Sequence, residues 1–391
     1  MKRPQSNSRS HAVKRLRIKF WGVRGSIPTP GPATIRYGGH TSCLEVRCDG
    51  EIIILDAGTG IRPLGALLAR QFKGKPLNLT LLLSHTHWDH IQGFPFFKPA
   101  YEAKNRIRVI GSEATKRGLA SVLTSQMESP FFPVGLRDLP SSIAIEQLTT
   151  GSLRIGSVRI KALRVNHPGR CVGYRLSTPY GSLVYVPDNE LACRLPSSQP
   201  LRLSDEGFSD FVRDCDLLVM DAQYDRSEYP AHAGWGHGCL DDVVSLCCGA
   251  GVKQLQLFHH DPDHSDTKID SMLRHARRIA KSLKSPMRVE AAREGAEVVF
   301  PCLHTVGLRT SFCEVAALVI SIGSGVVPRG GRSCSSESIL TSTPLPHPCA
   351  KKASVARPTF RARDDSPCRC RAWEFRAPPT PRVARRDWSI P

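Results

Sequence analysis

The segment LLLSHTHWDHIQG, residues 81–93, constrains the fold more than any other part of the sequence. The apolar run at residues 77–83, LNLTLLL, is typical of a strand that is covered on both faces of a sheet. It stops at a loop in which four of six residues are His or Asp, namely His85, His87, Asp89 and His90. The sequence therefore predicts a buried strand with a dense polar site at its end.

Imidazole and carboxylate groups together favour zinc, manganese or iron as a bound divalent ion. His85 and His87 lie two positions apart beyond the strand and can point at one ion, whereas Asp89 and His90 can point at a second. Two ions lie about 3.5–4 Å apart in two-metal hydrolases. The alternative is a loop of solvated histidines, but four ligand-type side chains directly after a buried strand favour a metal site.

Strand and helix patterns alternate along residues 14–303 and predict two β-rich halves, each with helices. Asp49-Gly50 predicts a hairpin between strands 42–47 and 51–55, and Glu294-Gly295 predicts another between strands 288–292 and 296–300. Two such halves imply two sheets packed face to face with helices outside. The other expected strands are residues 17–21, 106–110, 158–165, 171–176, 182–186, 217–220 and 254–258, and the expected helices are residues 63–71, 112–126, 240–248 and 265–283.

The net charge of +19 is concentrated at the two ends of the chain. Residues 1–20 contain seven Lys or Arg and no acidic residue, and residues 304–391 contain fourteen basic and six acidic residues. After about residue 303, Pro, Arg, Ser and Cys replace the periodic pattern. We therefore divide the chain into a basic tail (1–16), a folded domain (17–302) and a low-complexity tail (303–391) that we expect to be disordered. Basic tails either hold RNA or DNA loosely or are simply solvated.

The sequence gives no sign of export or of membrane insertion. No apolar segment of the signal-peptide kind follows the basic N-terminus. The longest uncharged apolar-rich run, residues 315–327, is too short and too interrupted by Gly and Ser to span a bilayer. The fourteen cysteines form no Cys-x-x-Cys pair. We expect a cytoplasmic protein with reduced thiols and no membrane contact.

The His-x-His-x-Asp-His loop, together with FWGVRGSIPTPG at residues 20–31 and IIILDAGTG at residues 52–60, resembles the metallo-β-lactamase superfamily. The two additional segments resemble its phosphodiesterase branch, which includes ribonuclease Z. The resemblance covers roughly residues 17–302. It implies a four-layer αββα sandwich with two divalent metal ions at one edge of the two sheets, Zn²⁺ first, with Mn²⁺ or Fe²⁺ as alternatives.

The resemblance also implies ligands at later strand ends. His167 in RVNHPG matches a ligand of the first metal, and Asp188 in LVYVPDNE matches the carboxylate that bridges both metals. In LQLFHHDPDHSD the family spacing favours His259 over His260 as a ligand of the second metal, and we expect His264 on the surface. Taken alone, His167 and Asp188 could equally be turn residues. No cysteine occupies the bridging position, and Cys171, Cys193 and Cys239 are interpreted as small buried hydrophobic residues.

Three more residues have implied roles near the metals. By resemblance, His237 in GWGHGCLDD would donate a proton to the leaving oxygen, and Asp221 in DLLVMDAQY would orient its imidazole. Their alternatives are a histidine at a helix start and a carboxylate in a turn. Asp56 is expected to accept the spare N–H of a ligand histidine rather than to bind metal. We expect Asp89 to be both a metal ligand and a catalytic residue.

The implied reaction is hydrolysis of a phosphodiester by a hydroxide that bridges two divalent metals. The substrate could be an RNA end, a cyclic nucleotide or a small diester. The alternatives are a thioester or lactone hydrolase on the same scaffold, and a binding module without catalysis. Ribonuclease Z carries a long arm that grips transfer RNA, and the insertion at residues 128–140 is too short to match it.

Two further questions stay open in the sequence. The aromatic residues after the metal loop are either a surface that stacks a nucleobase or part of the core. These residues are Phe94, Phe96, Phe97 and Tyr101. A homodimer is an option that relatives suggest, but no interface can be read from the residues.

Overall fold

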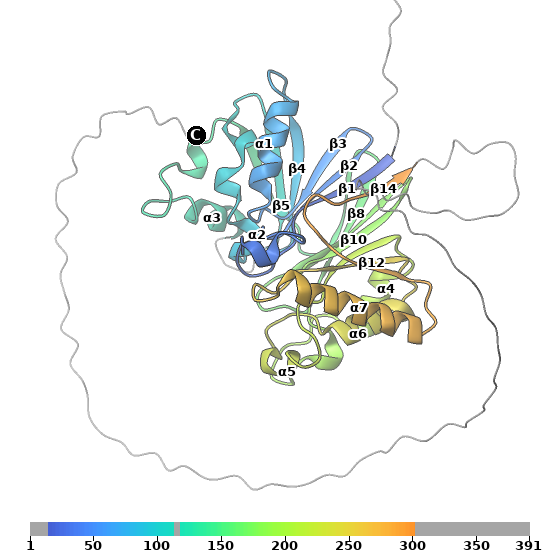
Figure 1. The fold of residues 1–391 in the computed structure, drawn as a ribbon. Helices are drawn as coiled ribbons and strands as arrows, with labels where there is room; N and C mark the ends of the chain where they lie inside the picture. Colours follow the sequence, from blue (N-terminus) through green and yellow to red (C-terminus); the bar gives the residue numbers. More distant parts are fainter. Residues whose placement is uncertain (1–14, 113–117, 302–391) are drawn as a thin grey trace, which may run out of the picture. The chain divides into compact units, whose positions relative to one another are not determined.

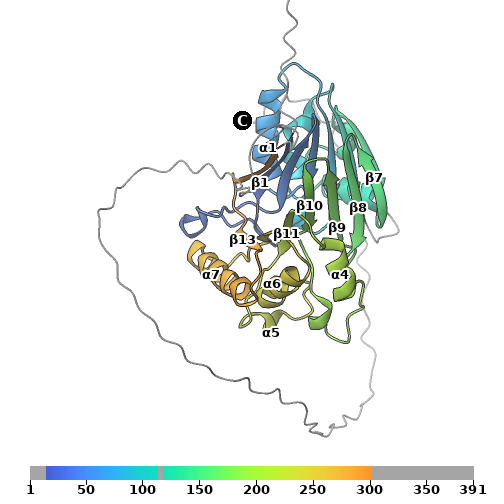
Figure 2. The ribbon, with the colours of Figure 1, turned by 90° about the vertical axis from the view of Figure 1, so that its right-hand side faces the viewer.

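The computed structural model describes residues 15–112 and 118–301, and these residues form two seven-stranded sheets. The first sheet has the order β14 (Glu297–Pro301), β1 (Arg15–Gly22), β2 (Cys43–Cys48), β3 (Glu51–Leu55), β4 (Asn78–Leu83), β5 (Arg106–Gly111), β6 (Ser142–Gln147). The second has the order β13 (Arg288–Ala291), β12 (Gln254–Phe258), β11 (Leu217–Asp221), β10 (Gly181–Val186), β9 (Val172–Thr178), β8 (Val158–Arg164), β7 (Gly151–Ile155). Figure 2 shows β7 to β10 side by side.

Both sheets are mixed, with an antiparallel part and a parallel part. In the first sheet β3 to β6 are parallel, and in the second β10 to β13 are parallel. The predicted hairpin at Asp49-Gly50 is confirmed, since β2 pairs antiparallel with β3 and both turn residues have positive φ. The strand predicted at residues 77–83 is β4, which is buried along nearly its whole length between β3 and β5.

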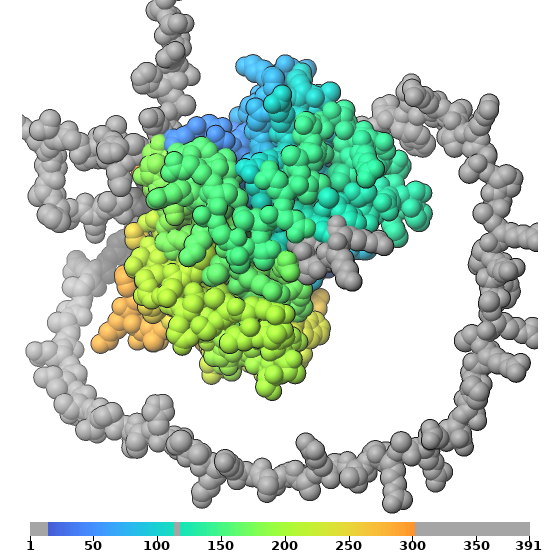
Figure 3. Space-filling view, turned by 180° about the vertical axis from the view of Figure 1, so that it is seen from behind, coloured from blue at the N-terminus to red at the C-terminus, as the bar shows by residue number. Residues whose placement is uncertain are grey.

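Helices cover the outer faces of the two sheets. α1 (Ile61–Gln71) and α3 (Gly118–Ser125) lie beside the first sheet, and α4 (Asp205–Val212), α6 (Leu240–Gly249) and α7 (Asp266–Ser282) lie beside the second (Figure 1). One apolar cluster lies between the sheets, a second between the first sheet and its helices, and a third between the second sheet and its helices. Four layers with three apolar interfaces are the predicted αββα sandwich, which is therefore confirmed. Seen from behind, the teal residues from the first half of the folded domain lie against the green and yellow residues from its second half (Figure 3).

Short helical segments lie mainly in the loops. Two are α-helical, α2 (Trp88–Ile91) and α5 (Tyr229–His232). Five are 3₁₀ segments, η1 (Pro32–Thr34), η2 (Phe94–Phe96), η3 (Lys98–Tyr101), η4 (Leu136–Asp138) and η5 (Ala192–Arg194). Within the described residues, no helix combines the length and the apolar character needed to cross a bilayer.

The predicted hairpin at Glu294-Gly295 is wrong. β13 pairs with β12 in the second sheet, whereas β14 pairs with β1 in the first sheet. The chain crosses between the sheets because β1 has an edge that β14 completes, and the turn itself is tied to β1 by the Phe20 N–H, which donates to Ala296 O at 3.0 Å. Local turn chemistry could not reveal that the two strands separate.

The sequence also missed β6, β7 and α4. β6 and β7 are edge strands with mostly exposed or half-buried side chains, so neither has a strong apolar pattern. Ser112 as the start of a helix, and the tail at 303–391, fall partly or wholly outside the described residues. β1 begins at Arg15, two residues before the expected start of the domain.

Candidate metal centre

The seven predicted ligands come from four places along the chain and converge at the ends of strands. The loop after β4 supplies four of them, the turn between β8 and β9 supplies His167, the end of β10 supplies Asp188, and the end of β12 supplies His259. Strand ends in α/β sheets commonly form such sites, because polar residues there escape the apolar core. The structure therefore brings together every residue that was predicted as a ligand, although their role as ligands stays a prediction.

The ligand-type atoms form two adjoining groups, each within 4.8 Å of one another. The first group is His85, His87, His167 and Asp188, and the second is Asp89, His90 and His259. Asp188 stands between them: its Oδ2 lies 3.7 Å from His85 Nε2 and 3.5 Å from His259 Nε2. The arrangement can hold two cations with Asp188 shared.

The buried histidines are oriented so that Nε2 faces the cluster. The Nδ1 atom of His90 donates to Asp56 Oδ2 at 2.8 Å, that of His167 donates to Gly236 O at 2.9 Å, and that of His259 donates to Gln223 Oε1 at 2.9 Å. A histidine whose Nδ1 carries the proton presents an unprotonated Nε2, the form that binds metal.

Several buried polar atoms of the cluster have no hydrogen-bond partner among the described residues. These atoms are His85 Nε2, His90 Nε2 and Asp188 Oδ1. His90 Nε2 and Asp188 Oδ1 lie 3.1 Å apart but without hydrogen-bond geometry. Since buried polar atoms are rarely left without partners, a cation between them is the chemical group that fits.

The electrostatics of the cluster favour positive charge beside its two carboxylates. Burial alone would raise the pKa values of Asp89 and Asp188, but the neighbouring His90 and His259 outweigh it and hold both pKa values well below the usual range. Burial lowers the pKa of His167 to about 3, so this imidazole is neutral. Burial also disfavours a charged His259, yet Asp188 and Asp89 raise its pKa to about 9. The two buried carboxylates thus draw positive charge to the cluster, a role that His90 and His259 fill here and that a bound cation could fill instead.

Asp56 lies behind this site and connects Ser84, Tyr185 and His90 by hydrogen bonds. Its carboxylate is fully buried and accepts four hydrogen bonds, from Ser84 N–H at 2.7 Å, Ser84 Oγ at 2.8 Å, Tyr185 OH at 2.7 Å and His90 Nδ1 at 2.8 Å. Its φ of 60° is uncommon outside glycine. The structure places Asp56 behind His90, a predicted ligand, as the sequence analysis expected.

His237 and Asp221 form a pair at the open side of the cluster. Asp221 ends β11 and is fully buried, and its Oδ2 accepts from His237 Nδ1 at 2.8 Å. The His237 ring stacks on the His259 ring, with centroids 4.9 Å apart and planes 19° apart. His237 also belongs to a third group of ligand-type atoms with Asp188 and His259. A metal ligand is therefore the alternative to a proton donor.

Two supporting residues were missed by the sequence analysis. Gln223 is buried, accepts from His259 and donates through Nε2 to Asp261 Oδ2 at 2.7 Å. Glu190 is also buried and accepts from the N–H groups of Gly234 and Gly236. A carboxylate two residues after a predicted bridging ligand, in PDNE, was the signal available for Glu190.

Two glycines let the backbone approach two of the histidines that are predicted as ligands. A Cβ on Gly25 would lie 2.3 Å from the His259 ring, and a Cβ on Gly236 would lie 2.4 Å from His167 Nδ1. Gly236 also has a φ of +90°. Both positions therefore exclude a side chain, and this keeps the loops tight against the cluster.

The positions of His260, His264 and three cysteines can be compared with the expectations from the sequence. His260 lies outside the cluster, because its Nε2 donates to Ala292 O at 2.8 Å, so the choice of His259 agrees with the geometry. The expected surface position of His264 is wrong: its side chain is buried and bonded to Glu228 at 3.0 Å. Cys171 and Cys239 are buried as expected, but Cys193 is exposed.

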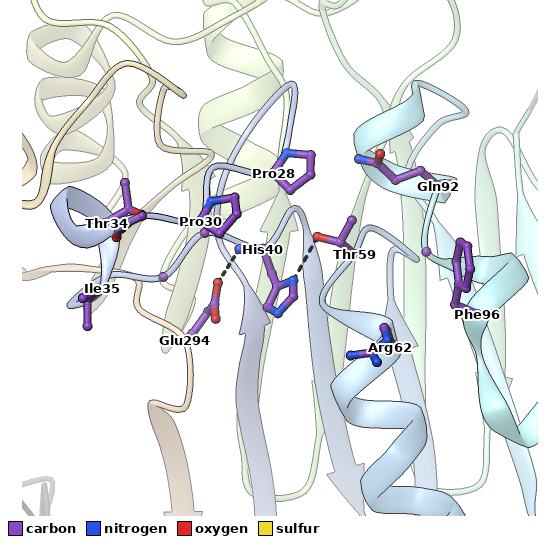
Figure 4. A pocket seen from close by; sticks show the side chains of 14 residues that line it. Pro28, Pro30, Thr34, Ile35, His40, Thr59, Arg62, Gln92, Phe96 and Glu294 are labelled. Carbon is purple, nitrogen blue, oxygen red and sulfur yellow. Dashed lines mark hydrogen bonds between the residues drawn. The ribbon is translucent and has the colours of Figure 1, made fainter. Parts of the chain in front are cut away.

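A cavity of about 600 Å³ lies next to the metal loop but contains none of the seven predicted ligands. Figure 4 shows His40 among the residues that line it: its backbone N–H donates to Glu294 Oε1 at 2.5 Å, and its ring Nδ1 lies 3.1 Å from Thr59 Oγ1. Phe96 also lines this cavity and is 53% exposed, whereas Phe94 and Phe97 are core residues. Tyr101 is half-buried and donates its hydroxyl to Pro95 O at 2.6 Å. The aromatic group is thus mostly core.

Fold and site together define an αββα protein with a histidine and carboxylate cluster at the strand ends, the architecture of metal-dependent hydrolases. A family model described as "Beta-lactamase superfamily domain" matches residues 52–260. The chain belongs to this superfamily, in its metallo-β-lactamase fold group.

Relatives of known sequence or structure point in the same direction. Ribonuclease Z of Metallosphaera sedula is 24% identical over 296 residues, which cover 68% of this chain and 94% of that protein. The metallo-beta-lactamase fold protein YhfI from Bacillus subtilis has a TM-score of 0.53 at 17% identity and covers 73% of this chain and 99% of its own. A diphosphatase from the PhnP family has a TM-score of 0.52 at 18% identity, with 73% and 97% covered. At such identities the solved structures show the fold alone.

Proposed function

We propose that this protein is a metal-dependent phosphodiesterase whose catalytic domain is residues 17–302. The observation that carries the proposal is the pair of adjoining ligand groups that share Asp188, with the hydrogen-bonded pair His237 and Asp221 directly beside them. The first group would hold one divalent ion and the second group another. When bound, two such ions supply hydroxide at neutral pH and neutralise charge on a phosphate.

The side chains of this domain would perform the remaining tasks. Hydrolysis adds the oxygen of one water molecule to phosphorus, breaks the bond from phosphorus to the leaving oxygen, and requires a proton on that oxygen. Asp221 holds the Nδ1 proton of His237, so Nε2 is the nitrogen that can deliver a proton to the leaving group. Asp89 Oδ2 accepts the Ser26 N–H at 2.7 Å, and the same oxygen lies 3.1 Å from His259 Nε2. The cluster is therefore positioned before substrate binds.

The names of relatives support a phosphorus-containing substrate. The sequence relative is called ribonuclease Z, and a structural neighbour is called a diphosphatase. We propose an RNA end, a cyclic nucleotide or a small diester as the substrate. A transfer RNA precursor is less well supported, because the segment at residues 128–140 is too short for a gripping arm.

The native metal, the location and the assembly belong to the same proposal. We propose Zn²⁺ at both positions, because five of the seven predicted ligands are histidines and zinc readily binds nitrogen donors of this kind. Mn²⁺ and Fe²⁺ are the competing ions. We further propose a cytoplasmic enzyme and leave a homodimer as a question for solution measurements.

One substrate comparison tests the reaction class. Zinc-loaded or manganese-loaded protein should hydrolyse bis(4-nitrophenyl) phosphate and leave S-lactoylglutathione intact. If the thioester turns over while the diester stays inert, the protein is a thioester hydrolase on the same scaffold. If neither substrate reacts in metal-loaded protein, the proposal of catalysis is contradicted and a binding module is the better description.

A further inference from the structure

A pocket of about 650 Å³ opens beside His237. Its inner wall adjoins the candidate metal centre, since His237, Ser26 and Gln223 line it. Ser26 donates its N–H to Asp89, and Gln223 accepts from His259. A group that enters this pocket therefore stands next to the nitrogen that would protonate the leaving oxygen.

Another wall of the pocket is a row of three aromatic rings in contact, Tyr224, His232 and Trp235. Tyr224 and His232 stack with centroids 4.1 Å apart and planes 10° apart, and Trp235 meets His232 edge to face at 4.9 Å. Tyr224 is nearly buried, whereas Trp235 is 59% exposed. Of these three rings, the Trp235 indole is the most exposed to solvent.

The backbone around Trp235 is fixed although its side chain is exposed. The N–H groups of Gly234 and Gly236 donate to the buried carboxylate of Glu190 at 2.8 and 3.0 Å, and the Trp235 N–H donates to His232 O at 3.0 Å. Gly236 O in turn accepts from His167 Nδ1. An exposed indole on a rigid turn offers a flat contact surface at low entropic cost, which is typical of a recognition residue.

The charge of the pocket is negative. Glu228, Asp261 and Asp263 line it, and among its described lining residues Lys268 alone is a Lys or Arg. Lys268 already pairs with Asp225 at 2.6 Å and with Glu228 at 2.8 Å. A phosphate in this pocket would therefore meet repulsion, whereas the amino groups of a nucleobase would find carboxylate acceptors.

We propose that this pocket receives the leaving nucleoside of the diester, with its base stacked on Trp235, and that it disfavours a leaving nucleoside that carries a further phosphate. The proposal rests on the proposed phosphodiesterase function for the reaction, but not for the binding. Hydrolysis would release the nucleoside as an alcohol that has taken its proton from His237, and would leave the other product as a phosphate monoester. A quaternary ammonium group fits less well, because it prefers several open ring faces and His232 covers that of Tyr224.

The first test measures binding without turnover. Adenosine is titrated into the zinc-loaded full-length protein by calorimetry. We expect Trp235→Ala to weaken binding about tenfold and Trp235→Phe to stay within about threefold of wild type. The matched control is Phe131→Ala, which removes an aromatic ring that is 80% exposed in a different pocket and should change nothing. The proposal is overturned if Trp235→Ala binds like wild type, if Phe131→Ala weakens binding instead, or if phosphocholine binds more tightly than adenosine.

The second test concerns charge. A dinucleoside monophosphate is compared with the same compound carrying one added phosphate on the nucleoside that leaves, which product analysis identifies. We expect kcat/KM to be about tenfold lower for the compound with the added phosphate. For that compound, Asp263→Asn should raise kcat/KM about threefold above the wild-type value. If the added phosphate changes kcat/KM less than twofold, the proposed discrimination against a leaving nucleoside with a further phosphate is wrong.

The two proposals can fail separately. If bis(4-nitrophenyl) phosphate is hydrolysed but adenosine does not bind through Trp235, only the nucleoside pocket is wrong. If adenosine binds through Trp235 but no diester is cleaved, the proposed reaction is wrong and the binding site stands.

Discussion

The Nδ1 atom of His237 lies 2.8 Å from Oδ2 of Asp221, and this pair stands at the open side of a cluster of seven predicted metal ligands. Asp221 is fully buried at the end of β11, and its Oδ1 also accepts the Gln223 N–H at 2.9 Å. The carboxylate therefore has a fixed position, and it fixes one tautomer of the imidazole. A histidine held in this way is suited to give a proton to a leaving group.

Replacing His237 by Ala should slow turnover of bis(4-nitrophenyl) phosphate by about 10²-fold, the usual contribution of a general acid. The metal content should stay at the wild-type value, because the seven predicted ligands remain. Steady-state kinetics and metal analysis on the same preparation check both statements. A variant that loses metal along with activity would show that His237 is a ligand, as its proximity to Asp188 and His259 allows.

Asp221→Asn should act through His237. We expect kcat to fall with little change in KM, since the amide can no longer hold an imidazolium and favours the wrong tautomer. In the double variant with His237→Ala the second substitution should add almost nothing, because both act on one proton transfer. Independent, multiplicative losses would contradict a shared role.

Removal of a predicted ligand should abolish metal binding and catalysis together. His87 is exposed, so His87→Ala leaves the core intact while it removes a donor whose Nδ1 lies 3.0 Å from His167 Nε2. Metal analysis and diester hydrolysis should both drop to background. The matched control is His275→Ala, which removes a histidine on α7 that pairs with Asp241 and belongs to none of the ligand groups, and this variant should keep metal and activity. Full activity in His87→Ala would show that His87 is not a metal ligand.

Asp56→Asn should weaken metal binding without a direct ligand being changed. The amide cannot accept all four hydrogen bonds that reach the carboxylate, so the ring of His90 loses its anchor. Loss of such a supporting partner costs roughly 10–100-fold in metal affinity. A competition titration with a chelator measures this change. An unchanged affinity would mean that Asp56 serves folding only.

Arg24 should matter for stability rather than for chemistry. Its guanidinium is fully buried and donates to Gly38 O at 2.9 Å, Asp261 O at 2.9 Å and His264 O at 2.6 Å, which ties the loop after β1 to the loop after β12. Arg24→Met leaves these carbonyls without that donor and should lower the free energy of unfolding by about 3 kcal/mol. Urea denaturation measures the change, and Arg108→Met, at an exposed ion pair with Glu146, should leave the midpoint unchanged. Equal effects of the two substitutions would contradict this role for Arg24.

The parts of this structure that the sequence could predict are those that are local in the chain. The ligands His85, His87, Asp89 and His90 follow one apolar strand, and the hairpin at Asp49-Gly50 follows from turn chemistry. Positions set by packing between distant segments escaped prediction. The strands β13 and β14 look like a hairpin in the sequence, yet they complete the edges of two different sheets.

The supporting residues of the site show the same limit. Gln223 and Glu190 look like ordinary polar residues after strands, and only the fold shows that they hold His259 and the turn at Trp235. His264 looked like a surface histidine at a helix start but is covered by the loop that carries Glu228. Each of these depends on contacts between residues more than thirty positions apart in the chain.

Metal analysis of the purified full-length protein, after loading with zinc or manganese and removal of free ions, tests the central claim most directly. The account predicts about two ions per wild-type chain and a clear loss in Asp188→Ala, because Asp188 stands between both ligand groups. Wild-type protein that is folded and retains no ion after loading would contradict it.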